Sequence, residues 1–156
     1  MDKTFYITTP IYYPSAKPHM GHAYSSIIAD FFARFKIIDD YQVYFLTGTD
    51  EHGLKIQRSA EKAGKEPQIF CDQISQTFRD LSDTLNLSNT DFIRTTETRH
   101  KKTVQHLWNE LEKNDDIYLS NYSGWYSISD EAFYNEDEIE EVDGKKIAIS
   151  SKSLVC

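Results

Sequence analysis

The first 47 residues place a β-like segment, a helical segment and a second β-like segment in a row, and this order constrains the fold most. Phe5-Tyr6-Ile7 is short and β-prone, and the segment from Gln42 to Thr47 has a continuous apolar centre. Such a run is typical of a parallel strand that is covered on both faces. Strand, helix and strand within about 45 residues form a βαβ unit. We therefore predict an α/β fold with a parallel sheet flanked by helices.

Helical periodicity continues through the rest of the first 115 residues. The first helix runs from about His19 to Ile38, and helical spacing relates its apolar positions Ile27, Ile28, Phe31, Phe35 and Ile38. Further helices are predicted at residues 53–63, at 67–85 and, capped by Thr96, up to about Asn114, with a short strand at 91–94. Their expected inner faces carry Phe70, Ile74, Phe78, Leu81 and Leu85 in one helix, and Val104, Leu107, Trp108 and Leu111 in the other. Cys71 lies beside such a face, which favours a small core residue over a nucleophile.

The pattern changes after Asp116, where aromatic residues occur in short β-like pieces. Ser123-Gly124 and Asp143-Gly144 each indicate a hairpin. We therefore predict two domains, residues 1–115 and residues 116–156, the second being the start of a small β-rich subdomain.

Composition narrows the functional class. A net charge of −8 argues against a general nucleic-acid-binding surface, although it leaves room for tRNA on a local patch, and no DNA partner is expected. No apolar run approaches the ~20 residues of a membrane span, and the chain opens directly into a strand pattern without a signal peptide. Two cysteines imply no disulfide framework. We expect a cytoplasmic protein with no membrane partner.

A histidine pair stands between the first strand and the first helix. His19 and His22 are three residues apart, so they share a face of the first helical turn, and Gly21 between them lets a ligand approach the backbone. A helix start adds unpaired N–H groups and a partial positive charge. These features predict a polyphosphate site, whereas a bare pair also occurs by chance on helix surfaces or as metal ligands.

A second motif, Thr-Gly-Thr-Asp-Glu-His-Gly at residues 47–53, follows the second strand at its carboxyl end. In open α/β sheets, ligands bind at that edge. Asp50 there could pair with the α-ammonium of an amino acid, and the alternative is an ordinary turn former. His52 and Lys55 are near enough to assist, but a solvated loop and helix face explain them equally well.

Both motifs resemble one known family. His-Met-Gly-His at 19–22 resembles the HIGH signature of class I aminoacyl-tRNA synthetases. Residues 7–13 (ITTPIYY) and 45–53 (FLTGTDEHG) are similar to methionyl-tRNA synthetases of the bacterial type. The resemblance runs from about Thr4 to about Tyr134 and identifies the chain as an N-terminal fragment of this family.

The resemblance implies an activity and a fold. The family activates methionine with ATP, supplied as its Mg²⁺ complex, to methionyl-adenylate, and then transfers methionine to tRNA(Met). The implied fold is the first half of a Rossmann-type nucleotide-binding domain, followed by a connective subdomain. A fragment without the KMSKS loop and the anticodon-binding domain is expected to be weakly active or inactive alone.

Site residues follow from the matching positions. His19, Gly21 and His22 are expected to bind ATP, the two histidines acting in catalysis. Ile11, Tyr13, Asp50 and His52 are expected to bind methionine. From the residues alone, Ile11 and Tyr13 would more simply be packing residues.

Two departures from the family pattern matter. Where many relatives carry zinc-binding CxxC knuckles, this chain has Ser127-Ile128-Ser129-Asp130, so no structural zinc and no other bound metal is predicted. Ser151-Lys152-Ser153 is not a KMSKS loop, because Ile149 and Ser150 stand where Lys and Met belong.

The sequence leaves three other functions open. They are a class I synthetase for another aliphatic amino acid, a small nucleotidyltransferase with an HxGH motif, and a non-catalytic binding module derived from a truncated paralogue.

Overall fold

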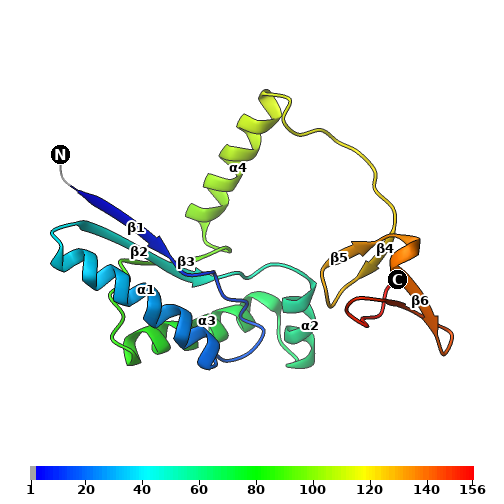
Figure 1. Cartoon of the computed structure of the whole chain (residues 1–156), viewed down its shortest axis with the longest axis horizontal. Helices are drawn as coiled ribbons and strands as arrows, with labels where there is room; N and C mark the ends of the chain where they lie inside the picture. Colours follow the sequence, from blue (N-terminus) through cyan, green and yellow to red (C-terminus); the bar gives the residue numbers. More distant parts are fainter. Residues whose placement is uncertain (1–2) are drawn as a thin grey trace. The chain divides into compact units, whose positions relative to one another are not determined.

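A computed structural model describes residues 3–156 of the chain, which divides into two compact units, Met1–Leu107 and Trp108–Cys156 (Figure 1). No helix among the described residues is long and apolar enough to cross a membrane.

The first unit is built on a parallel sheet. Its strands are β1 (Thr4–Thr8), β2 (Gln42–Thr49) and β3 (Asp91–Arg94), in the order β1-β2-β3. The connecting helices are α1 (Met20–Ile38), α2 (Leu54–Lys62) and α3 (Pro67–Thr84), and α4 (Thr98–Lys113) follows β3. Figure 1 shows α1 and α3 on the same side of the sheet, as right-handed crossovers in one direction require. The predicted α/β fold with a parallel sheet is confirmed.

One face of this sheet carries the core. Phe45 is fully buried against Ala29 and Ala33 of α1, with Ile7 and Val43 packed around them. The alternate residues Tyr6 and Tyr44 point to the other face and are 63% and 48% exposed. The expectation that β2 is covered on both faces is therefore wrong for the described residues: β2 is paired on both edges but packed on one face.

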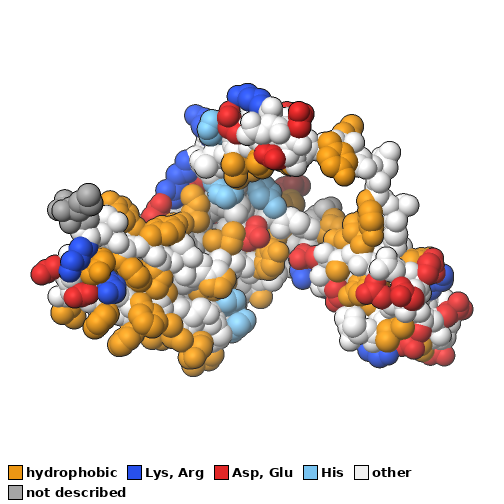
Figure 2. Space-filling model, turned by 45° about the horizontal axis from the view of Figure 1, so that its top comes forward, with side chains coloured by type: hydrophobic (Ala, Val, Ile, Leu, Met, Phe, Trp, Pro, Cys, Tyr) orange, Lys and Arg blue, Asp and Glu red, His pale blue; other side chains and the backbone are white. Residues whose placement is uncertain are grey.

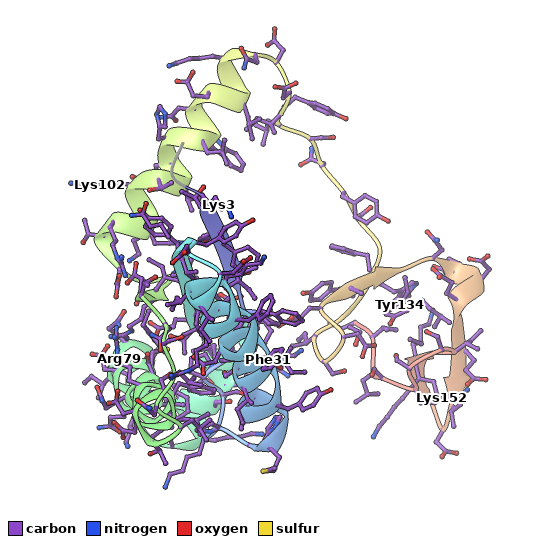
Figure 3. All side chains as sticks on the ribbon, turned by 60° about the vertical axis from the view of Figure 1, so that its left-hand side comes forward. Lys3, Phe31, Arg79, Lys102, Tyr134 and Lys152 are labelled. Atoms are coloured by element: carbon purple, nitrogen blue, oxygen red, sulfur yellow. The ribbon has the colours of Figure 1, made fainter. Side chains whose placement is uncertain are left out.

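Small residues form the buried side of α1. Ala23, Ser26, Ala29 and Ala33 are buried, because their short side chains let the helix approach the sheet closely. The larger apolar residues with helical spacing lie outside, and Phe31, shown on α1 in Figure 3, is 64% exposed. Figure 2 shows hydrophobic side chains gathered on the surface of this unit. The helix was predicted, but its apolar stripe does not mark the core-facing side.

The remaining helices differ in how well their faces were predicted. Phe70 and Phe78 of α3 are buried as predicted, and Phe78 joins Tyr12 and Phe92 in a second cluster. Cys71 is 1% exposed, which confirms a core residue.

The predicted inner face of α4 is wrong, because this helix contains no buried residue. Val104, Leu107 and Trp108 are each about half exposed, and Figure 3 shows Lys102 projecting from the helix. The helix also begins at Thr98, and the Thr96 hydroxyl donates to Glu51 instead of capping it.

The second unit contains two antiparallel hairpins. Strands β4 (Trp125–Ser127) and β5 (Ala132–Tyr134) form one, and β6 (Ile139–Val142) and β7 (Lys145–Ala148) form the other. A short 3₁₀ helix, η1 (Glu136–Glu138), lies between the hairpins.

The observed turns of these hairpins can be compared with the two hairpin turns predicted from the sequence. The Asp143-Gly144 turn joins β6 to β7 with φ values of 52° and 72°, as a two-residue hairpin turn requires, so this prediction is confirmed. The predicted hairpin at Ser123-Gly124 is wrong, because these residues precede β4 and the turn lies at 128–131. Positive φ falls there on Glu131, a residue type that sequence rules do not favour for such a turn.

Candidate functional site

The site lies where the loops after β1 and β2 meet, at the carboxyl ends of the parallel strands. The Tyr12 N–H donates to the Gly48 carbonyl at 2.9 Å, and the Asp50 N–H donates to the Tyr12 carbonyl at 2.9 Å. These bonds continue the parallel ladder beyond β1 and join the loop containing Ile11 and Tyr13 to the loop containing Asp50.

The two histidines cap α1. His19 is the N-cap residue, and its Nδ1 accepts from the Gly21 N–H at 3.0 Å. His22 Nδ1 accepts from the His19 N–H at 3.1 Å, which completes a reciprocal capping box. The rings stack with centroids 3.8 Å apart. An accepting Nδ1 carries no proton, so the tautomer that fits these two hydrogen bonds has its ring hydrogen on Nε2. In this tautomer both rings carry an Nε2–H donor at the positive end of the helix.

Glycine at position 21 leaves room for the ring that forms this cap. A Cβ on Gly21 would lie 2.9 Å from Cε1 and 3.1 Å from Nδ1 of the His19 ring. A side chain at position 21 would require the His19 ring to shift, so the glycine leaves room for that ring.

Two aromatic rings pack against His22. Its ring lies 4.8 Å from the Tyr12 ring and 5.1 Å from the Phe78 ring, measured between centroids. Burial, and secondly the charge of His19, lower the pKa of His22 below its ordinary value. The Tyr12 hydroxyl donates to the His22 carbonyl at 3.3 Å and shares a hydrogen bond with Ser26 at 3.0 Å. Tyr12 thus fixes the first turn of α1.

A pocket of about 320 Å³ opens beside the histidine pair. It is lined by Ile11, Tyr12, Tyr13, Ser15, Ala16, Lys17, His19 and His22. The two Nε2–H groups, the Lys17 ammonium and the helix start give this pocket the character of an anion site. The apolar wall comes from the loop that precedes the helix.

Asp50 and His52 lie on the neighbouring loop. Asp50 is half-buried, and its Oδ1 accepts from the Thr95 hydroxyl at 3.5 Å. His52 is exposed, with Nε2 at 3.3 Å from the Thr95 carbonyl oxygen. His52 lines a second pocket of about 500 Å³ together with Glu51 and Gly53. The structure therefore gathers Ile11, Tyr13, His19 and His22 around one pocket and attaches Asp50 to it through the backbone of Tyr12.

Sequence reasoning missed several residues of this region. Tyr12 and Lys17 sit inside the quoted motif, and the signal for Tyr12 was its place in a Tyr-Tyr pair, where one ring turns inward and the other outward. Glu51 and Arg94 form a bidentate ion pair across 43 residues, for which no local pattern exists.

Among residues 3–156, no group of three or more His, Cys, Asp or Glu side chains is arranged to hold a metal ion. At the position of the zinc knuckle, the Ser127 hydroxyl instead accepts from the Asp130 N–H at 3.2 Å. The Asp130 carboxylate accepts from the hydroxyls of Tyr134, Ser151 and Ser153.

The family described as tRNA synthetases class I (M) matches residues 5–146. This chain belongs to that family. The resemblance noted from its motifs is confirmed, as is the fold, which is the N-terminal part of the class I nucleotide-binding domain followed by antiparallel strands.

Individual relatives agree. The methionine–tRNA ligase of Listeria monocytogenes is 52% identical over 139 residues, covering 89% of this chain and 21% of the relative. That of Rickettsia prowazekii is 54% identical over 141 residues, covering 90% of this chain and 28% of the relative. Methionyl-tRNA synthetase of Mycobacterium tuberculosis in complex with methionyl-adenylate has a TM-score of 0.92 at 45% identity, covering 99% of this chain and 30% of that one. The chain thus spans less than a third of the length of these relatives.

Proposed function

We propose that this chain carries the N-terminal part of the catalytic domain of a methionine–tRNA ligase. The proposed reaction joins methionine and ATP to methionyl-adenylate and pyrophosphate, and then transfers methionine to tRNA(Met). The observation that carries the proposal is the pocket at the start of α1, where two Nε2–H donors stand beside the loop of Asp50. Its structural similarity to a relative in complex with methionyl-adenylate supports the adenylate chemistry.

ATP is assigned to the helix start. The phosphates, entering as the Mg²⁺ complex, would accept hydrogen bonds from His19 and His22 above the bare backbone of Gly21. The methionine carboxylate attacks the α-phosphorus, so the protein supplies position and positive groups where negative charge develops. Removing one preorganised donor of this kind typically costs about 10²–10³ in kcat.

Methionine is assigned to the adjacent loops. Asp50 would pair with the α-ammonium group, with His52 on the same loop. Ile11 and Tyr13 would contact the thioether, since a sulfur–aromatic contact contributes about 0.3–1.5 kcal/mol. The Lys55 ammonium lies 5.8 Å from the centre of the Tyr13 ring, which helps to hold this aromatic wall.

Four further parts of the proposal are supported by the sequence alone. They are a domain boundary between residues 115 and 116, the lack of a structural zinc, a cytoplasmic location where charged tRNA is consumed, and neither DNA nor membrane as a partner. Elemental analysis of the purified protein checks the zinc prediction, because stoichiometric zinc would contradict it.

Amino-acid-dependent exchange of labelled pyrophosphate into ATP tests the activity. The natural full-length polypeptide is assayed with methionine, leucine and isoleucine at equal concentrations. We expect exchange with methionine and background rates with the two branched amino acids. Faster exchange with leucine or isoleucine would assign another class I synthetase, and background rates with all three would favour a binding module.

A further inference from the structure

A buried carboxylate lies directly behind the site. The Glu51 side chain is 0% exposed, and its two oxygens accept four hydrogen bonds. Arg94 Nε donates to Oε1 at 2.7 Å and Nη2 to Oε2 at 2.9 Å. The hydroxyls of Thr49 and Thr96 donate to Oε1 at 2.7 Å and to Oε2 at 2.5 Å. The carboxylate is therefore held from the ends of both β2 and β3.

One guanidinium is shared by two carboxylates in this cluster. Arg94 also donates to Asp72 of α3 at 2.5 Å, which fixes the guanidinium between two acids. Burial alone would raise the pKa of Glu51, but the hydrogen bonds from Arg94, Thr96 and Thr49 bring it below its ordinary value. Hydrogen bonding to Glu51 likewise raises the pKa of Arg94, so the pair stays ionised.

Thr95 connects the cluster to the site loop. Its hydroxyl accepts from the Glu51 N–H at 2.8 Å and donates to Asp50 Oδ1 at 3.5 Å. Its carbonyl lies 3.3 Å from His52 Nε2. Its own N–H donates to the Thr49 carbonyl at 3.2 Å. One threonine thus contacts four consecutive loop residues, and its neighbours Arg94 and Thr96 both bind the Glu51 carboxylate.

We propose that Glu51, Arg94 and Thr95 are positioning residues that fix the Asp50 carboxylate where it meets the ammonium group of the amino acid substrate. The inference rests on the proposed function of Asp50 and adds to it a unit that contacts no substrate. Glu51 clamps residues 94–96 against the loop, and the Thr95 hydroxyl then sets the Asp50 carboxylate.

Kinetics of the natural full-length polypeptide test this. The variants are Glu51→Gln, which keeps the shape but not the charge, and Thr95→Val, which removes the hydroxyl. Asp91→Asn is the matched control, because Asp91 makes a bidentate pair with Arg99 at the opposite end of β3. A misplaced carboxylate should raise the KM for methionine roughly tenfold to a hundredfold. The KM for ATP should stay within about twofold in all variants, because the histidine cap is untouched.

A double-mutant cycle separates positioning from stability. In a protein that already carries Asp50→Ala, Glu51→Gln should change kcat/KM for methionine less than about twofold, since the group it positions is gone. Equal rises in both KM values, or a full effect of Glu51→Gln without Asp50, would overturn the proposal. If Glu51→Gln does not fold, Thr95→Val gives the same comparison.

A second measurement does not depend on activity. Hydrogen exchange of a peptide covering residues 48–53 should be faster in Thr95→Val than in the parent, and unchanged in Asp91→Asn. Unchanged exchange in Thr95→Val overturns the positioning role. Absent methionine-dependent activity in the parent overturns the proposed function instead, so the two failures are distinguishable.

Discussion

Replacement of Gly48 by alanine is expected to disrupt the junction of β2 and β3. Gly48 pairs with Ile93, and a Cβ there would lie 2.0 Å from the Ile93 carbonyl oxygen and 2.7 Å from Cγ2. Ordinary carbon–oxygen contact needs about 3.3 Å, so the strands must separate by about 1.3 Å. Overpacking of this kind costs about 1–3 kcal/mol, and two stretched ladder bonds cost about 1 kcal/mol each. We expect a loss of about 3–5 kcal/mol in the free energy of unfolding.

Urea unfolding followed by the helical circular dichroism signal measures this loss. Gly124→Ala is the control, because a Cβ there meets nothing closer than 3.6 Å. The control should stay within about 0.5 kcal/mol of the parent. A Gly48→Ala protein within about 1 kcal/mol of the parent would refute the close approach of the strands as a constraint on this position.

Three further predictions concern single side chains. Tyr12→Phe removes the hydroxyl bonded to Ser26 and should lower the free energy of unfolding by about 1 kcal/mol in urea titration; an unchanged midpoint would contradict this bond. Burial, and secondly the charge of Glu51, raise the pKa of Cys71 to about 11. A maleimide at neutral pH should therefore label the exposed Cys156 far faster than the buried Cys71, which mass spectrometry would show. Equal labelling of the two cysteines would contradict the buried position of Cys71. Because the folded-state pKa of His22 is lowered from 6.5, His22 contributes stability that is present above pH 6.5 and is lost as the pH falls below it. Thermal unfolding of His22→Gln should therefore show a smaller fall in melting temperature over that range than the parent shows. An equal fall in both proteins would exclude His22 as the source of this pH dependence.

Local sequence patterns predicted the helices and strands and the positions of the motifs. The β1-α1-β2 unit follows from short-range periodicity, and the positions of His19 and His22 follow from the end of one element and the start of the next. The Asp143-Gly144 hairpin was predictable because the turn chemistry is contained in two residues.

Local sequence patterns did not predict the contacts between residues far apart in the chain. A helical stripe of Ile and Phe in α1 suggested the core, but the helix packs through Ala29 and Ala33 because it lies close to the sheet. The ion pair of Glu51 with Arg94 depends on two strands meeting in register, which no residue near either partner signals. Thr96 was assigned to a helix cap because its competing partner is 45 residues away.

The central claim is that the Nε2–H groups of the capping histidines stabilise the phosphates as methionyl-adenylate forms. His19→Asn tests it most directly. Asparagine is also a favoured N-cap residue, but its side chain is too short to place a donor where the imidazole Nε2–H lies. In pyrophosphate exchange by the full-length polypeptide, the account predicts a fall in kcat of roughly a hundredfold or more, with the KM for methionine nearly unchanged. Near-normal exchange by a folded His19→Asn protein would contradict it.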